Sequence, residues 1–352
     1  MRFKVLGAAI TLVAAAVVLA GCGATNATEP NSSDEESGPW TIALSNGYYG
    51  NTARVQLAAE VKAYADLPDV KPKIKELIIN NAGEAVAAQI AAFNGMVADG
   101  VDAILLDSSS LDGLNASIQE AVDQGIIVVA YNDQVSSDLV YQVETVGPKY
   151  GAAGMQALVD ELGGKGNIVV IRGLAGNAVD AAEAEGFYGV LENYPDIKVL
   201  NESYGKWDDG TAQAIMADLL SRYDNIDGVY TTGGMEQGVV RAYIAADRPF
   251  VPVIGTDTNG FAGMLKEYAG DGLTGFQVSS HLWQSALALK TAISLLEGEE
   301  MPKFIEVTQN AWGTDEAIER YLPDQPPGLF LEFDNPDQGI TLRPEDVLKY
   351  MS

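Results

Sequence analysis

Three kinds of residue are scarce in this 352-residue chain: it has one cysteine, one histidine and 21 lysines and arginines against 49 acidic residues. Because Cys22 is the only cysteine, no disulfide can form within the chain, and the fold must depend on a hydrophobic core. Because His281 is the only histidine, a serine nucleophile has a single possible imidazole base, and a transition-metal site lacks ligands. The net charge of −28 argues against nucleic acid binding, which needs a basic surface.

Motifs of catalysis and of phosphate binding are also missing. The chain has neither a Gly-x-Ser-x-Gly turn nor a Gly-x-x-x-x-Gly-Lys-Ser/Thr loop. The acidic segment 334–339 resembles a calcium loop, but Pro336 occupies a ligand position and the bidentate acid is lacking. We therefore expect no enzyme activity, no metal site and no cofactor.

The single cysteine stands at the end of a secretory signal. Two basic residues and an apolar stretch, 5–19, precede the run Leu19-Ala20-Gly21-Cys22. This run resembles the bacterial lipobox, in which the cysteine is lipidated; an ordinary signal peptide with a chance cysteine is the other interpretation. We predict a signal peptide over 1–21, a lipid anchor at Cys22 and a disordered polar tether over 22–39. The protein is then extracytoplasmic and anchored to the bacterial cell membrane.

From residue 40 onward, strand-like and helix-like segments alternate in two series. The first series has strand-like runs at 41–44, 74–79, 103–106 and 126–131, with helical periodicity at 52–65, 84–98 and 111–124. The second has strand-like runs at 168–171, 197–200, 228–230, 251–254 and 273–277, with helix-like stretches at 150–162, 179–193, 211–223, 238–246 and 261–268. A helix over 282–296 and a strand over 304–307 follow. The alternation predicts an α/β fold with two doubly wound, Rossmann-like lobes of parallel sheet.

Polar and aromatic residues gather directly after the predicted strands. Ligands of open α/β sheets bind beyond the carboxyl ends of the strands. Carboxylates, amides and hydroxyls there can bond the hydroxyl groups of a polyhydroxylated ligand, and aromatic rings can stack on its apolar faces. The candidate ligand-binding residues are Tyr48, Tyr49, Asn51, Arg54, Asp107, Asn132, Asp133, Asn177, Asp180, Trp207 and Asp257.

Several of these candidates also have a purely structural interpretation. Asn177 and Asp257 could serve as helix N-caps, since both residue types are favoured there. Asp107 could start a turn, Arg54 could form a surface ion pair, and Trp207 could simply pack. His281 is a candidate for packing rather than for chemistry.

Five segments together resemble type I periplasmic solute-binding proteins of the ribose-binding kind. They are 100–106, 125–130, 162–167, 225–229 and 253–257, and the resemblance covers about 40–305. It implies two lobes joined by a three-segment hinge, in a monomer. Residues 40–146 with 280–308 would form the N-terminal lobe, and residues 147–279 with 309–352 the C-terminal lobe.

The resemblance also implies roles for individual site residues. Asp257 matches the family's aspartate, and Trp207 matches an aromatic position that stacks on the sugar. Asn132-Asp133 stand where ribose-type members have an Asp-Arg pair, and Ser279 stands near the position of a glutamine. The first loop resembles the Gly-Asn-x-x-Arg branch of sugar-importer binding proteins, whose arginine would be Arg54.

The resemblance implies a receptor that captures a small polar ligand, a sugar or polyol, between two closing lobes and delivers it to an ABC transporter permease. A sensory receptor of the same fold that signals to a membrane kinase is one alternative. An extracellular carbohydrate-active enzyme is another.

Overall fold

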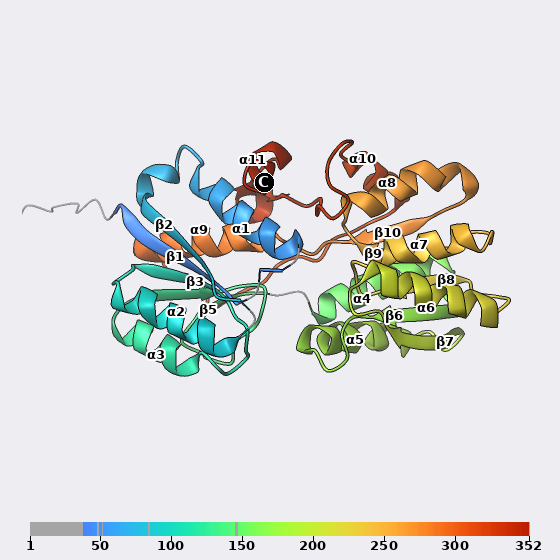
Figure 1. The fold of residues 1–352 in the computed structure, drawn as a ribbon, viewed down its shortest axis with the longest axis horizontal. Helices are drawn as coiled ribbons and strands as arrows, with labels where there is room; N and C mark the ends of the chain where they lie inside the picture. Colours follow the sequence, from blue (N-terminus) through green and yellow to red (C-terminus); the bar gives the residue numbers. More distant parts are fainter. Residues whose placement is uncertain (1–37, 48, 51, 84, 145–146, 352) are drawn as a thin grey trace, which may run out of the picture. The chain divides into compact units, whose positions relative to one another are not determined.

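The structure, a computed structural model, describes residues 38–47, 49–50, 52–83, 85–144 and 147–351. The predicted signal sequence, Cys22 and nearly all of the predicted tether lie outside these residues, as do the candidates Tyr48 and Asn51. The described part of the chain forms two six-stranded sheets and one two-stranded sheet, and helices cover the larger two (Figure 1).

The first sheet is parallel throughout, with the strand order β11-β5-β4-β3-β1-β2. In chain order its strands are β1 (Trp40–Asn46), β2 (Ile74–Asn81), β3 (Ala103–Asp107), β4 (Ile127–Ala130), β5 (Tyr141–Val143) and β11 (Phe304–Ile305). The central strand β3 is buried along its whole length. Such a strand reads as an unbroken apolar run because helices cover both of its faces.

Helices lie on both faces of the first sheet (Figure 1). One face carries α1 (Thr52–Ala65) and α9 (Gln284–Leu296), and the other carries α2 (Val86–Ala98) and α3 (Asn115–Asp123). The two faces have separate cores, with Leu57 and Trp283 in one and Phe93 and Ile118 in the other. This sheet and its helices are the first lobe.

The second sheet has the order β12-β10-β9-β8-β6-β7 and is parallel except for β12, which runs antiparallel to β10. Its strands are β6 (Gly166–Arg172), β7 (Ile197–Tyr204), β8 (Gly228–Thr231), β9 (Val253–Thr256), β10 (Gly275–Val278) and β12 (Ala311–Trp312). The helices α4 (Pro148–Glu161) and α5 (Ala178–Leu191) pack on one face. The other face carries α6 (Asp209–Arg222), α7 (Glu236–Ala245), α8 (Asn259–Tyr268) and α10 (Thr314–Arg320). These elements are the second lobe.

Local chemistry fixes the starts of helices that face the carboxyl ends of the strands. The Asn177 side chain accepts a hydrogen bond from the backbone N–H of Val179 at 2.8 Å and so caps α5. Asp208 caps α6 in the same way through the N–H of Thr211, at 2.7 Å. Pro148 opens α4, where its fixed φ suits the first helical turn.

The two sheets repeat one strand order, β2-β1-β3-β4-β5 in the first lobe and β7-β6-β8-β9-β10 in the second. The prediction of two doubly wound α/β lobes is confirmed. The order reverses between β1 and β3 and between β6 and β8, and ligands of such sheets bind at these switch points. The short strands β5 and β12 were not predicted, because runs of three and two residues leave no periodicity to read.

The chain passes between the two lobes after β5, β10 and β11. We call these three stretches the hinge passages. Residues 321–333 then make a fourth passage, which the sequence did not predict. We call this segment the strap.

The strap returns the chain to the first lobe. Beyond it lie the hairpin β13 (Asp334–Asn335) and β14 (Ile340–Thr341) and the helix α11 (Pro344–Leu348). The apolar side chains of Phe333, Ile340 and Val347 join the first-lobe core beside α1. The expectation that 309–352 belongs to the C-terminal lobe therefore fails for the residues after the strap, because their apolar side chains cover α1.

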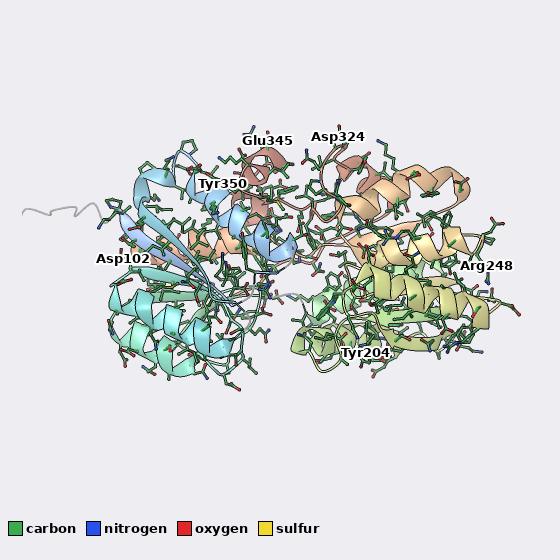
Figure 2. All side chains as sticks on the ribbon, in the orientation of Figure 1. Asp102, Tyr204, Arg248, Asp324, Glu345 and Tyr350 are labelled. Atoms are coloured by element: carbon green, nitrogen blue, oxygen red, sulfur yellow. The ribbon has the colours of Figure 1, made fainter. Side chains whose placement is uncertain are left out.

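The end of the chain is also held to the first lobe by polar contacts. Tyr350 lies beside α1, and its hydroxyl donates to the Asp66 carboxylate (Figure 2). The Lys349 ammonium lies 3.3 Å from the same carboxylate. A proline-rich sequence gives no indication of which lobe it will cover, so this docking could be seen only in three dimensions.

Candidate ligand site

A cavity of about 420 Å³ is lined by residues from both lobes and from the strap. Its lining comes from segments that follow strands: the start of α1 after β1, the loop after β4, and the loops after β6, β7, β8, β9 and β10. The position at the carboxyl ends of the strands agrees with the rule for open α/β sheets. The volume suits a small molecule.

Four predicted residues meet on the first-lobe side of this cavity. The Arg54 guanidinium donates to the carboxylates of both Asp107 and Asp133, and the Asn132 amide donates to Asp107 at 3.1 Å. Arg54, Asn132 and Asp133 line the cavity, and Asp107 lies buried behind them. We call these four residues the first-lobe wall.

The charges of the first-lobe wall depend on one another. Burial raises the pKa of the Asp107 carboxyl, the Arg54 guanidinium opposes that rise, and the Asp133 charge adds to it. One guanidinium thus balances two carboxylates. Asn132 has a left-handed backbone, φ 60°, and its N–H donates to the Gln284 amide oxygen at 3.0 Å. The hydrogen bond holds this uncommon conformation next to the ion pairs.

Three residues that line the cavity from the second lobe, Tyr150, Glu183 and Thr232, each have a buried side-chain oxygen without a well-aligned hydrogen bond to a residue that the structure describes. Two of these oxygens lie close to a hydroxyl group: Thr232 lies near the Glu183 carboxyl and Thr256 near the Tyr150 hydroxyl, and each contact lowers the pKa of its partner. Burial raises the pKa of Glu183 well above its ordinary value, and the nearby Asp180 charge adds to the rise. Buried polar groups normally have partners, so these three are poised to receive a polar ligand.

Trp207 supplies the aromatic surface of the second-lobe side. It lines the cavity from the loop after β7, in a left-handed conformation with φ 52°. Its indole packs against Gly173 so closely that a Cβ on Gly173 would lie 2.2 Å from the ring. We call Tyr150, Glu183, Trp207 and Thr232 the second-lobe wall.

The loop after β8 leaves space for the Tyr150 hydroxyl. Gly233 has φ 96°, and a Cβ at this position would come within 2.9 Å of that hydroxyl. Asn177, also predicted, caps α5 and lines the cavity at the same time. The N-cap interpretation is confirmed, and contact with a ligand stays a prediction.

Besides Asp107, four predicted residues that the structure describes are not in the lining. Asp180 binds the Arg172 guanidinium at 2.6 Å and the N–H of Gly173 at 2.8 Å, and so fixes the loop that supports Trp207. Tyr49 packs partly buried against the first-lobe core. Asp257 and Ser279 lie in a buried polar cluster between the lobes.

This interlobe cluster joins two hinge passages to the strap. Glu332 of the strap accepts hydrogen bonds from Trp283 at 2.7 Å, from Asn310 at 2.8 Å and from Ser279, and it lies 3.0 Å from His281 Nδ1. Although burial opposes it, the His281 contact lowers the pKa of Glu332. The lone histidine is thus part of the packing between the lobes.

Asp257 belongs to the same cluster and binds backbone. Its carboxylate accepts the N–H of Ser280 at 2.9 Å and that of Glu332 at 3.2 Å. Burial raises its pKa to about 6, and the Glu332 charge adds to the rise. In this structure Asp257 fastens the strap to the end of β9 and does not line the cavity.

Sequence reasoning missed Tyr150, Glu183 and Thr232. Tyr150 and Glu183 lie in the first two turns of α4 and α5, beyond the loops that directly follow the strands. The first turns of these helices face the same edge of the sheet, so polar residues there are the signal that could have indicated both. Thr232 directly follows β8 but has the appearance of an ordinary loop residue.

The described ranges offer neither a metal-binding cluster nor a membrane-spanning helix. No cluster of three or more His, Cys, Asp or Glu side chains there is arranged to hold a metal ion. Among the helices with described coordinates, none is both long enough and apolar enough to span a bilayer.

Comparison with known proteins relates both lobes to one family. The model of the family described as "periplasmic binding protein domain" matches residues 42–300. A xylitol-binding protein of Mycolicibacterium smegmatis is 30% identical over 256 residues, which are 71% of this chain and 73% of that protein. A D-allose-binding periplasmic protein of Escherichia coli is 28% identical over a stretch that covers 40% of this chain and 49% of that protein.

The fold also has solved counterparts. An ABC transporter periplasmic solute-binding protein from Actinobacillus succinogenes, with bound D-allose, aligns with a TM-score of 0.68 and 20% identity. The alignment covers 79% of this chain and 99% of that one. This likeness shows that the two-lobed architecture is shared.

Proposed function

The chain belongs to the periplasmic binding protein family, and on this premise we propose that it captures a sugar or polyol between its two lobes and delivers it to the permease of an ABC importer. The cavity is lined from both lobes, so a ligand bound there would favour the closed arrangement over the open one. The closed form is then the one that the permease receives.

The observation that carries this proposal is the second-lobe wall. Three residues that line one cavity beside an indole ring each have a buried oxygen without a well-aligned hydrogen bond in the described chain. A ligand with many hydroxyl groups can satisfy all three oxygens, because each hydroxyl both donates and accepts. The first-lobe wall adds carboxylate and amide groups, which also bond hydroxyls.

The chemistry of the cavity supports a neutral polyhydroxylated ligand over a charged one. Arg54 is engaged by two carboxylates, so its charge is balanced before a ligand arrives. A polyol ligand also agrees with the xylitol that the name of the Mycolicibacterium smegmatis relative specifies.

A thermal-shift screen tests the ligand class. The ligand-free protein is melted with polyols, pentoses, hexoses and amino acids. A ligand at 100 times its Kd should stabilise the protein by about 2.7 kcal/mol. If only amino acids raise the melting temperature, the proposal is overturned. If a sugar is consumed during incubation, the protein is an enzyme and not a receptor.

We also propose that the protein is a monomer whose anchor is a lipid on Cys22, after cleavage of the signal over 1–21. The sequence run that ends at Cys22 supports this part of the proposal. Cys22→Ser should move the protein from the membrane fraction to the soluble fraction of the cells. Retention in the membrane fraction would show that another feature provides the attachment.

A further inference from the structure

The strap is hydrogen-bonded to the second lobe along its length. The Asn259 amide donates to the carbonyl oxygens of Leu322 at 3.0 Å and Gln325 at 3.1 Å. The Asn259 N–H donates to the Leu329 carbonyl at 2.7 Å, and the Leu331 N–H donates to the Asp257 carbonyl at 2.9 Å. These bonds place Phe330 opposite Thr258 in an antiparallel bridge.

The first lobe holds the same residue from the other side. The Gln56 side chain of α1 is fully buried. Its amide nitrogen donates to the Phe330 carbonyl at 3.2 Å, and its amide oxygen accepts the Phe330 N–H at 3.0 Å. Both backbone polar groups of Phe330 are therefore bound to the first lobe, while its neighbours are bound to the second.

Neighbouring residues of the strap have different surroundings. Gly328 and Phe330 line the cavity, whereas Leu329 between them is fully buried in the first-lobe core. The Phe330 ring is only partly buried and packs against that core. Because both lobes hold its backbone, Phe330 has a fixed place in the cavity lining.

This part of the lining comes from outside the region that defines the family. The family model ends at residue 300, and the strap begins at residue 321. An apolar ring at this position offers no hydrogen bond, so a hydroxylated carbon that reaches it loses the bonds it makes in water. A fixed apolar ring thereby limits the length of the ligand.

We propose that Phe330, placed in the cavity by the strap, is the residue that sets the size of the ligand this protein accepts. The inference rests on the proposed function, because it takes the ligand to be a polyol or sugar. Replacing the ring by a smaller side chain opens space at one side of the cavity, and a larger ring closes it.

The test measures the affinities of the full chain for erythritol, xylitol and sorbitol by titration calorimetry. Phe330→Ala should shift the ratio of affinities toward the longer polyols by roughly tenfold, and Phe330→Trp should shift it the other way. Phe330→Leu keeps an apolar contact with the core and should shift the ratio in the direction of Phe330→Ala, by a smaller factor. Melting temperatures of all variants report whether the fold is kept.

Phe304→Ala is the matched control, because Phe304 is 47% exposed on β11 and does not line the cavity. It should leave every affinity unchanged. If the Phe330 variants lower all affinities by one common factor, the ring only packs, and the inference fails while the proposed function stands. If the wild type binds no polyol and no sugar, the proposed function itself fails, and the ligand class assigned to this site fails with it.

Discussion

The first-lobe wall and the second-lobe wall differ in how their polar groups are satisfied. In the first, one guanidinium binds two carboxylates, and an amide completes the network. In the second, three buried oxygens lack a well-aligned hydrogen bond in the described chain. The first wall is therefore already stabilised by its own contacts, and the second gains contacts only when a ligand arrives.

This difference separates two effects of mutation. Removing a member of a satisfied buried network leaves its partners unpaired and lowers the stability of the folded state. Removing an unpartnered group costs the ligand-free protein little, because no bond is lost, but it weakens ligand binding. Substitutions in the first wall should thus act mainly on the free energy of unfolding, and those in the second mainly on affinity.

The largest effect is expected from Arg54→Met. It leaves the buried Asp107 carboxylate and Asp133 without their counter-charge, which should lower the free energy of unfolding by about 3 kcal/mol. Adding Asp107→Asn should recover part of this loss, because the neutral amide needs no counter-charge. Urea unfolding of the ligand-free protein measures both.

The matched control for Arg54 is Arg222→Met. Arg222 pairs with Asp218 on the surface, where the two side chains are 57% and 50% exposed. An exposed pair contributes less than about 1 kcal/mol. If Arg54→Met is no more destabilising than Arg222→Met, the ion pairs do not stabilise the first-lobe wall. The proposed difference between the two walls would then be wrong.

Next in size is Trp207→Ala, which removes the aromatic face of the second-lobe wall. Affinity should fall about 30-fold, which corresponds to roughly 2 kcal/mol, a common loss for a central aromatic contact. Gly173→Ala should act in the same direction, because its methyl group would displace the indole. Tyr204→Ala is the control, since Tyr204 is 41% exposed and absent from the cavity lining. If Trp207→Ala and Tyr204→Ala lower the affinity equally, Trp207 does not contact the ligand.

The lobes and the first-lobe wall could be predicted from sequence because they follow local rules. Apolar runs such as 103–106 are buried strands, and the residues after β1, β3 and β4 meet at one edge of the sheet. The second-lobe wall escaped prediction because Tyr150 and Glu183 look like ordinary helix residues until α4 and α5 pack together. Their lack of partners is a property of three-dimensional packing.

The strap and the interlobe cluster could not be predicted from sequence for a different reason. Glu332 and His281 are 51 residues apart in the chain, and nothing in the spacing of either indicates the contact. Asp257 follows β9 as a ligand-binding residue would, yet its carboxylate binds the backbone of the strap. Position after a strand therefore identifies the right edge of the sheet but not which side chains remain open to a ligand.

A smaller effect on affinity is expected from Tyr150→Phe and Thr232→Val. Each change removes one unpartnered hydroxyl and should weaken ligand binding about tenfold, the upper range for a neutral hydrogen bond. The unfolding free energy of the ligand-free protein should stay within about 0.5 kcal/mol of the wild-type value. Tyr243→Phe is the control, because the Tyr243 hydroxyl is also buried without a partner but lies outside the cavity lining. A stability loss without an affinity loss would assign these hydroxyls to the core instead of the ligand site.

The smallest effect concerns the pH dependence of stability. Burial raises the pKa of Glu183, that of Asp257 to about 6 and that of Glu236 to about 7. A carboxyl group with a raised pKa holds its proton more firmly in the folded state, so the stabilisation is present below the unfolded pKa and is lost as the pH rises through the folded one. The unfolding free energy of the ligand-free protein should therefore fall between pH 5 and pH 8.

Glu183→Gln isolates the contribution of the second-lobe wall to this fall. The amide stays neutral at every pH, so the decrease in unfolding free energy between pH 5 and pH 8 should become smaller. Asp66, whose pKa is lowered to about 2 by its hydrogen bond from Tyr350, loses its contribution only under more acidic conditions and does not mask the change. Glu185→Gln, an exposed site on the same helix, is the control. An unchanged profile in Glu183→Gln would mean that the Glu183 carboxylate is solvated in the cavity, and the contrast between the two walls would then rest on the hydroxyl groups alone.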